Sequence, residues 1–290
     1  MQTVAIVGMG RVGCALAQAL DASGFRVAQI VFKDVADVNP LEGKLNDQPI
    51  VASFGSVASL DVDICFITTQ DSKIGETAES LVGKIGSERP KFVFHTSGAL
   101  ESVELSAFAR SGSFIGSVHP LRSIPNRDNR PDIFKDCYFG LEGSPQAIAK
   151  AEEIVKALHG KPFHIEPGGK ALYHAAAVVA CGHLTALIDV SRKMLLGSGL
   201  NEEMAATVLM PLIEGTVRNL YGRQAFEVLT GPFQRGDSET VERHLAVLKN
   251  EGRRDAEAVY KCLGEISIDL AEKRWISEDE AEELRKSLRR

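Results

Sequence analysis

Two strand-like segments of the sequence end on a histidine next to small polar residues. Lys91–Leu100 reads KFVFHTSGAL, so His95 and Ser97 directly follow an apolar run. Ile115–Leu121 reads IGSVHPL and brings His119 to the end of a second run. Imidazole and hydroxyl groups can bind a substrate oxygen or carry a proton, so we treat all three side chains as candidate catalytic groups. The alternative is structural: a histidine that only holds backbone, and a serine that forms a turn or caps a helix from residue 101.

The second half of the chain offers further polar side chains that could reach a substrate. Lys170 and His174 lie one helical turn apart on a predicted helix, with Tyr173 beside them. A cation or imidazole there could polarise a carbonyl or imine, or protonate a product. Arg235, in LTGPFQRGD, could form a fork with a substrate carboxylate or a cofactor phosphate. The alternatives are a solvated lysine, a core histidine and a structural turn in which Asp237 caps the next helix.

A glycine-rich loop follows the first predicted strand. Residues 5–13 read AIVGMGRVG, in which the spacing G-x-G-x-x-G precedes a helical pattern. The first glycine permits a tight turn, the second lets a pyrophosphate approach the backbone, and the third allows close helix–strand packing. The helix N-terminus adds partial positive charge. The loop therefore predicts a dinucleotide site, and a tight turn without ligand is the alternative. The expected cofactor-binding residues are Gly8, Met9, Gly10, Arg11, Val12 and Gly13.

The end of the second strand bears on which dinucleotide binds. An NAD site usually has an acid at this tip, whereas an NADP site has a cation nearby. Phe32 stands in the place of the acid, and Lys33 could meet a 2′-phosphate. Asp34 instead favours NAD, because it could serve as a displaced ribose ligand. A solvated Lys33–Asp34 pair is a third possibility. We expect NADP(H) in preference to NAD(H). Thr68 and Thr69, at the end of DICFITTQD, are also expected to contact the cofactor.

The elements that must position these groups alternate between strand and helix in the first half. Such alternation predicts an α/β fold, a Rossmann doubly wound and mostly parallel sheet whose ligands bind at the carboxyl ends of the strands. Beyond residue 166 only helical patterns remain, with helix caps predicted at Asn201, for a helix running towards Tyr221, at Asp237 and at Ser277. We therefore predict an NAD(P)-binding domain over residues 1–166 and an all-helical substrate and dimerisation domain over 167–290. The expected strands are Thr3–Val7, Arg26–Phe32, Pro49–Ala52, Asp63–Thr68, Phe92–His95, Phe114–Val118, Cys137–Leu141 and Pro162–Ile165.

The composition is that of an ordinary soluble globular protein. The 290 residues are 44% hydrophobic and 25% charged, with a net charge of −6 that disfavours nucleic-acid binding. Five scattered cysteines without a C-x-x-C pair fit a reducing compartment, and the N-terminus shows no signal-peptide pattern. We predict a cytoplasmic protein with neither membrane nor nucleic-acid partners and no metal site. Residues 171–188 are uncharged, but two histidines and a tyrosine favour a buried helix of a helical core over a membrane span.

The sequence also resembles a known family. The stretches GMGRVG, HTSGAL, GSVHPLRSIP, YHAAAVVACGHLTAL and LTGPFQRGDSETVERHL are similar to Rossmann-like proteins that carry a C-terminal helical domain of unknown function. These are relatives of the 6-phosphogluconate dehydrogenase superfamily and more distant relatives of pyrroline-5-carboxylate and ketopantoate reductases. The resemblance implies an NAD(P)-binding domain, a dimerising helical domain and a site between them. It also implies that Lys170 matches the lysine which these dehydrogenases present from their first long helix.

One position departs from the family pattern. Where relatives have asparagine after YHAAAVVA and a small residue, this chain has Gly182, which cannot supply an amide to a substrate. Together these features predict an NADP(H)-dependent oxidoreductase. It would transfer hydride between nicotinamide and a small carbonyl, hydroxy or imine compound bound between the domains. The alternative is a dinucleotide-binding sensor or scaffold without significant turnover. A serine hydrolase is disfavoured because HTSGAL lacks the G-x-S-x-G elbow.

Overall fold

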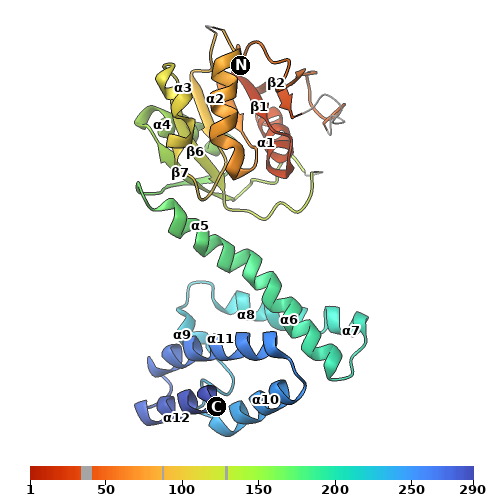
Figure 1. Ribbon diagram of the computed structural model, residues 1–290, viewed down its shortest axis with the longest axis vertical. Helices are drawn as coiled ribbons and strands as arrows, with labels where there is room; N and C mark the ends of the chain where they lie inside the picture. The colour runs from red at the N-terminus through yellow and green to blue at the C-terminus, as the bar shows by residue number, and fades with distance from the viewer. Residues whose placement is uncertain (34–40, 87, 128–129) are drawn as a thin grey trace. The chain divides into compact units, whose positions relative to one another are not determined.

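The computed structural model describes residues 1–33, 41–86, 88–127 and 130–290, which form two compact units (Figure 1). The first unit spans Met1–Cys181 and the second spans Gly182–Arg290. The division falls inside a long helix, C-terminal to the domain boundary expected after residue 166. The first turns of that helix therefore belong to the sheet-containing unit, together with the glycine loop and the strand tips.

The first unit is built on one eight-stranded sheet in the order β3-β2-β1-β4-β5-β6-β7-β8. β7 runs antiparallel to β6 and parallel to β8, and the other neighbouring pairs are parallel. This confirms the predicted Rossmann-like, mostly parallel sheet, and the strand ends differ from expectation by a few residues at most. The strands are β1 Thr3–Val7, β2 Arg26–Phe32, β3 Ile50–Ser53, β4 Ile64–Ile67, β5 Phe92–His95, β6 Phe114–Pro120, β7 Tyr138–Gly143 and β8 Lys161–His164.

Helices cover both faces of this sheet because its strands are apolar on both sides. Alternate residues of β1 enter different cores: Val4 and Ile6 join one cluster, and Ala5 and Val7 join the other. The first cluster is closed by α1 and α4, and the second by α2, the short 3₁₀ helix η2 and α3. The bounds of these helices are α1 Arg11–Ala22, α2 Ile74–Lys84, η2 Ser102–Leu105, α3 Ser106–Arg110 and α4 Pro145–Ala157.

The second unit contains helices joined by loops, and residues 182–290 form no strand. Its small core lies among α10, α11 and α12 and contains Val241, Ile268 and Leu284, all fully buried. The helices after residue 182 are α6 Leu184–Gly197, α7 Glu202–Thr207, α8 Met210–Asn219, α9 Ala225–Val228, α10 Ser238–Asn250, α11 Arg254–Glu272 and α12 Glu278–Arg289. Three predicted helix starts are confirmed by side-chain caps, at Asn201, Asp237 and Ser277.

Two expectations for the helical half were wrong. The helix expected from Asn201 towards Tyr221 is interrupted between α7 and α8, where Pro211 occupies the first turn of α8 and has no backbone N–H to continue a preceding helix. The apolar segment that starts at Lys170 is helical, as α5 (Lys170–Val178), a π-helical turn (Val179–His183) and α6, but it is not buried.

The exposure of this long helix is a prominent feature of the chain. The most apolar 18-residue stretch of Lys170–Gly197 has a mean hydropathy of 1.6, and among the described residues this helix is long and apolar enough to cross a membrane by length and composition alone. Leu172 is 80% exposed and Val179 is 60% exposed. Only Lys170 of α5 is buried, and no residue of α6 is. Exposed apolar surface of this kind marks a candidate interaction surface.

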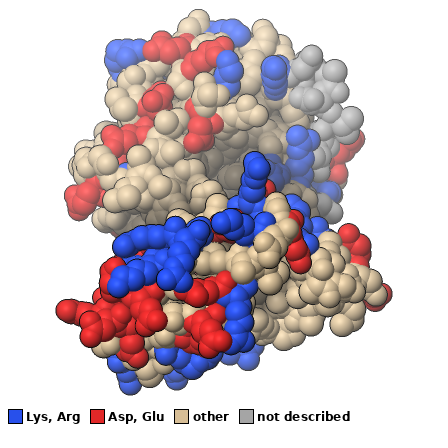
Figure 2. Space-filling model, turned by 60° about the horizontal axis from the view of Figure 1, so that its bottom comes forward, with Lys and Arg blue, Asp and Glu red and all other residues tan. Residues whose placement is uncertain are grey.

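Charged side chains of both signs lie close together on the surface (Figure 2). In the second unit Arg285 reaches three acidic groups, with Nη2 2.7 Å from Asp269 Oδ1 and 2.6 Å from Glu272 Oε2. Arg192 and Lys193 pair with Asp189 in the same way on α6. Much of the basic charge is therefore neutralised locally by neighbouring carboxylates.

Candidate functional site

The glycine loop between β1 and α1 has the geometry of a tight strand–helix turn. Gly8 has a φ of +98°, a conformation that favours glycine, and its N–H donates to Val31 O at 2.9 Å. A Cβ on Gly13 would lie only 2.1 Å from Gly8 O. Thr68 Oγ1 donates to the same Gly8 carbonyl and to Val7 O at 3.2 Å. The close approach of Gly13 and the hydroxyl of Thr68 therefore both fix the position of the Gly8 carbonyl.

A cavity of about 580 Å³ opens above this loop at the carboxyl ends of the strands. A Cβ on Gly10 would meet no atom within 4 Å, so the backbone here is open to a ligand. Thr69 Oγ1 is buried and is the buried side-chain polar atom of the described chain that lacks a hydrogen-bond partner. An open glycine beside an unsatisfied hydroxyl, at a helix N-terminus, fits the phosphates of a dinucleotide. The cavity is lined by Gly8, Gly10, Lys33, Phe54, Thr68, Thr69, Gln70, Lys73, Glu76, Thr77 and Ser80.

Ser97 forms the turn that follows β5. Its Oγ accepts from Ala99 N at 3.1 Å and from Leu100 N at 3.0 Å, and donates to Asp71 Oδ2 at 2.7 Å. The hydroxyl thus stabilises a turn, which is the structural alternative that the sequence analysis gave for Ser97. The bond to Asp71 ties this turn to the segment after β4, so that the tips of two neighbouring strands are held together.

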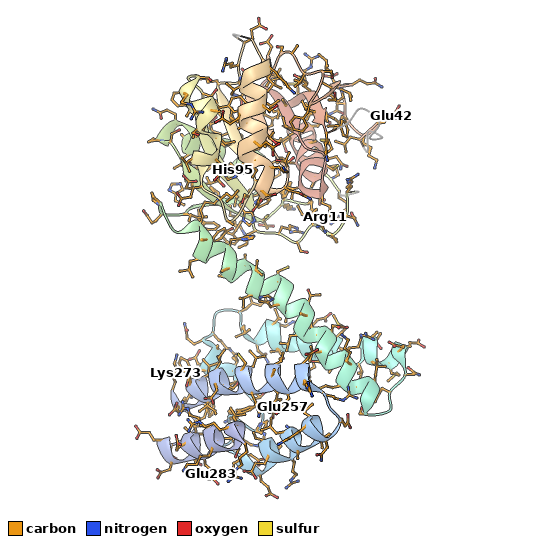
Figure 3. All side chains as sticks on the ribbon, viewed as in Figure 1. Arg11, Glu42, His95, Glu257, Lys273 and Glu283 are labelled. Atoms are coloured by element: carbon orange, nitrogen blue, oxygen red, sulfur yellow. The ribbon has the colours of Figure 1, made fainter. Side chains whose placement is uncertain are left out.

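His95 is fully buried and both of its ring nitrogens contact backbone. Nδ1 accepts from Ser97 N at 3.2 Å, and Nε2 lies 3.0 Å from Glu101 O. This requires the neutral tautomer with the proton on Nε2. Burial, and next the charge of Lys170, lower the pKa of His95 to about 4. The arrangement favours the structural alternative for His95. Figure 3 labels it in the first unit, as it does Arg11 of the glycine loop.

Lys170 is a buried cation at the tips of β5 and β6. Its Nζ donates to Ser97 O at 2.7 Å and to Ser117 Oγ, and Ser117 Oγ in turn donates to Ser97 O at 3.1 Å. The side chain is fully buried, and burial lowers its pKa to about 8 against the opposing pull of Glu142. The first residue of α5 is thereby joined to the sheet edge by an interior hydrogen-bond network.

His119, Tyr173 and His174 form an aromatic cluster around Gly98. His119 Nδ1 lies 2.7 Å from Tyr173 Oη, and the rings of His119 and His174 meet edge to face with centroids 5.7 Å apart. A Cβ on Gly98 would lie 2.5 Å from His174 Cδ2 and 2.8 Å from His119 Nε2, so only glycine allows both rings to approach. Burial, followed by the charge of Lys170, lowers the pKa of His119 to about 4. Burial raises the pKa of Tyr173 to about 12.

The predicted site residues therefore separate into groups. Gly8, Met9, Gly10, Lys33, Thr68 and Thr69 line the cavities at the glycine loop. The predicted catalytic residues Ser97, His95, His119, Lys170 and His174 come together with Tyr173 at the tips of β5 and β6.

The remaining predicted residues lie elsewhere. Arg11 is exposed at the start of α1, and Val12 packs against the core. Arg235 belongs to the second unit, where its Nη2 lies 3.9 Å from Asp237 Oδ2, and its contact with a substrate stays a prediction. Asp34 lies outside the described residues. No group of three or more potential metal ligands comes together in the ranges that the structure describes.

Several cavity residues escaped sequence reasoning. Phe54 follows the short strand β3, Lys73 directly precedes α2, Thr77 lies in the first turn of α2, and Arg127 comes from the long β6–β7 connection. The carboxyl-end rule for parallel strands could have pointed to Phe54 and Thr77, because both follow strands of the sheet. Nothing in the sequence places Arg127 beside a loop more than a hundred residues away.

The two halves of the chain match two family models. Residues 1–120 match a Rossmann-like domain, and residues 137–266 match DUF2520, a domain of unknown function. No curated protein matches the chain.

Solved structures of similar fold cover almost the whole chain. A proposed NADP oxidoreductase from Bacteroides fragilis is 21% identical, with a TM-score of 0.72 over 93% of this chain and 98% of that one. Protein TM1727 from Thermotoga maritima is 23% identical, with a TM-score of 0.68 and the same coverage. A reductive aminase from Aspergillus terreus, in complex with NADPH and ethyl levulinate, is 14% identical with a TM-score of 0.63 and covers 98% of both chains. At these identities the likeness establishes a shared fold.

Proposed function

This chain joins a Rossmann-like domain to a DUF2520 domain, and from this premise we propose that it is an NAD(P)-dependent oxidoreductase. The observation that carries the proposal is the cavity above the glycine loop, with its open Gly10 backbone and the unsatisfied Thr69 hydroxyl. The Aspergillus terreus reductive aminase, which shares the fold, holds NADPH. When bound, the nicotinamide supplies or accepts a hydride, and the side chains of this protein bind, orient and move protons.

We favour NADP(H) over NAD(H) as the cofactor. Phe32 at the tip of β2 is almost fully buried and cannot bind the ribose hydroxyls as an acid would. Lys33 follows it directly, is exposed and lines the cavity at the glycine loop. A cation in that place attracts the 2′-phosphate that distinguishes NADP from NAD.

The proton that accompanies hydride transfer is assigned to the cluster around Gly98. With a raised pKa, Tyr173 keeps its proton and can donate to His119 Nδ1, which leaves the proton of neutral His119 on Nε2 against Gly98. His174 is partly exposed beside it and is the stronger candidate to exchange protons with a substrate. Both imidazoles suit a small carbonyl, hydroxy or imine compound as the partner of the hydride.

Lys170 is assigned a positioning and electrostatic role. Its ammonium donates hydrogen bonds to Ser97 O and Ser117 Oγ, and the residue has no exposed surface. Burial is the main cause of the lowered pKa of His95 and His119, and the charge of Lys170 adds to it, so both imidazoles stay neutral. A neutral His119 can offer Nε2–H to a substrate oxygen or nitrogen without carrying charge.

Cofactor titration tests the proposal directly. We expect purified protein to bind NADPH more tightly than NADH when nicotinamide fluorescence is followed, and to oxidise NADPH with members of a panel of small carbonyl and imine compounds. His174→Ala should remove turnover while leaving the dissociation constant of NADPH within about twofold, because His174 does not line the cavity. Binding without turnover across the panel would favour a sensor or scaffold, and binding of neither dinucleotide would refute the proposal.

A further inference from the structure

A second, smaller cavity adjoins the glycine loop. It measures about 150 Å³ and shares Gly8, Gly10 and Lys33 with the larger one. It differs by the presence of Phe32, at the tip of β2, and of Arg127, from the connection between β6 and β7. Two segments far apart in the sequence therefore meet at the same small space beside the phosphate loop.

The lining of this cavity is cationic. Lys33 and Arg127 are both exposed, and none of the lining residues that the structure describes is a carboxylate. By contrast, Lys73 of the adjoining larger cavity is paired, with its Nζ 2.7 Å from Glu76 Oε2. Within the described residues no such ion pair forms at Lys33 or Arg127. Two positive charges beside one small cavity repel each other, and a bound anion would relieve this repulsion, so the cavity favours an anionic ligand.

The positive charge of Arg127 is also felt at the start of α1. Cys14 is buried in the first turn of α1, where its Sγ donates to Met9 O at 3.5 Å. Burial raises the pKa of this thiol, and the positive charge of Arg127 is the largest effect opposing it. This agrees with the position of the guanidinium in the lining of the cavity beside the loop.

The position of the cavity identifies the anion. In a Rossmann fold the pyrophosphate rests on the helix N-terminus, and the adenosine ribose lies between the glycine loop and the tip of the second strand. Phe32 marks that tip and excludes an acid from it. Building on the proposed function, we propose that Arg127 and Lys33 together bind the 2′-phosphate of NADP, and that Arg127 is a determinant of cofactor specificity. The planar guanidinium can take a phosphate with two parallel hydrogen bonds, which an ammonium cannot.

Adenosine nucleotides that differ only in the 2′-phosphate test this assignment without turnover. We would measure dissociation constants of 2′,5′-ADP, 5′-AMP, NADPH and NADH by calorimetry for the wild type and Arg127→Ala. The substitution should weaken 2′,5′-ADP and NADPH by about tenfold or more, since hydrogen bonds to charged groups contribute about 1.5–3 kcal/mol. The affinities for 5′-AMP and NADH should stay within about twofold, and Arg127→Lys should give a smaller loss than Arg127→Ala.

Arg130→Ala is the matched control, because it removes a cation from the same β6–β7 connection. The guanidinium of Arg130 is exposed and already paired with Asp132. This substitution should leave all four dissociation constants unchanged, and circular dichroism should confirm that each variant is folded. Equal weakening of NADPH and NADH would overturn the assignment by placing Arg127 on the shared part of the dinucleotide. An Arg127→Ala variant that binds all four ligands like the wild type would also overturn it, and both results leave the proposed function standing. Failure of the wild type to bind either dinucleotide would instead refute the proposed function.

Discussion

At the scale of single residues, two glycines of one loop have different physical reasons to be glycine. A Cβ on Gly13 would collide with the backbone oxygen of Gly8, whereas a Cβ on Gly10 would project into open space within the cavity lining. Gly13 is therefore required by the fold, whereas we propose that Gly10 is required by the ligand.

This difference predicts opposite outcomes for two alanine variants. Gly13→Ala should lower the free energy of unfolding by about 2 kcal/mol or more, because overpacking forces the backbone to move. Gly10→Ala should keep the stability of the wild type but weaken NADPH binding by about tenfold or more, because the methyl group occupies the approach of the pyrophosphate. Urea unfolding and fluorescence titration of both variants check this. Unchanged NADPH affinity in Gly10→Ala would contradict it.

The buried His95 predicts a pH-dependent stability. Its pKa is about 4 in the folded chain, lowered first by burial and then by Lys170, against about 6.5 when unfolded. The unfolded state binds more protons between these values. The stabilising contribution is therefore complete above pH 6.5 and declines as the pH falls towards 4, by roughly 3 kcal/mol. His119 adds to the same trend.

Urea unfolding at pH 7 and pH 4.5 measures this contribution. The loss of stability on acidification should be smaller in His95→Gln than in the wild type, although the variant is less stable at pH 7. His159→Asn is a suitable control, because His159 is exposed with a φ of +56° that asparagine tolerates. It should retain the full acid dependence. An equal loss of stability in the wild type and His95→Gln would exclude the buried imidazole as the cause.

At the scale of elements, α5 is fastened to the sheet edge by two polar contacts. Lys170 joins the tips of β5 and β6, and one helical turn later Tyr173 bonds to His119 of β6. These contacts bring a helix with little apolar burial of its own into the candidate site.

Removal of one contact should loosen this attachment. Tyr173→Phe is expected to lower the free energy of unfolding by about 1 kcal/mol, and more if His119 Nδ1 stays unsatisfied. It should also reduce turnover more than NADPH affinity, because the ring of His119 loses its orientation. Tyr138→Phe is the matched control, since Tyr138 packs on the same Phe163 ring but is 53% exposed. If both variants behave alike, the hydroxyl of Tyr173 has no special role.

At the scale of the whole molecule, the exposed apolar helix Lys170–Gly197 is the feature that bears on assembly. We propose that a second copy of the chain covers it, as expected from the sequence for a homodimer of the helical domain. The segment also passes length and composition tests for a membrane span. Its first residue, however, is a buried lysine in the hydrogen-bond network of the sheet edge, which favours a protein partner over lipid.

Sedimentation of a charged variant distinguishes these cases. Val179→Glu should convert a dimer to monomers by raising its dissociation constant about a hundredfold, because burial of an unpaired carboxylate costs about 3 kcal/mol or more. Val103→Glu, on the 3₁₀ helix η2, changes a valine of equal exposure (62% against 60%) and should leave the dimer intact. A wild type that sediments as a monomer without detergent would contradict the proposal.

The sequence by itself determined the architecture and the phosphate loop. These features are predicted by local signals: alternating apolar runs, three closely spaced glycines after the first strand, and side-chain caps. Each signal determines the structure only within a few residues of its own position in the sequence. They placed the strands, the helix starts and the glycine loop close to where the structure has them.

The tertiary structure decided what each candidate side chain does. Whether His95 faces a ligand or the backbone, whether Lys170 is solvated or buried, and whether Arg127 meets the glycine loop depend on contacts between residues far apart in the chain. The same holds for the helix that was expected to be buried and is exposed, because periodicity shows that a face is apolar but not what covers it. Only packing of the whole unit fixes these relations.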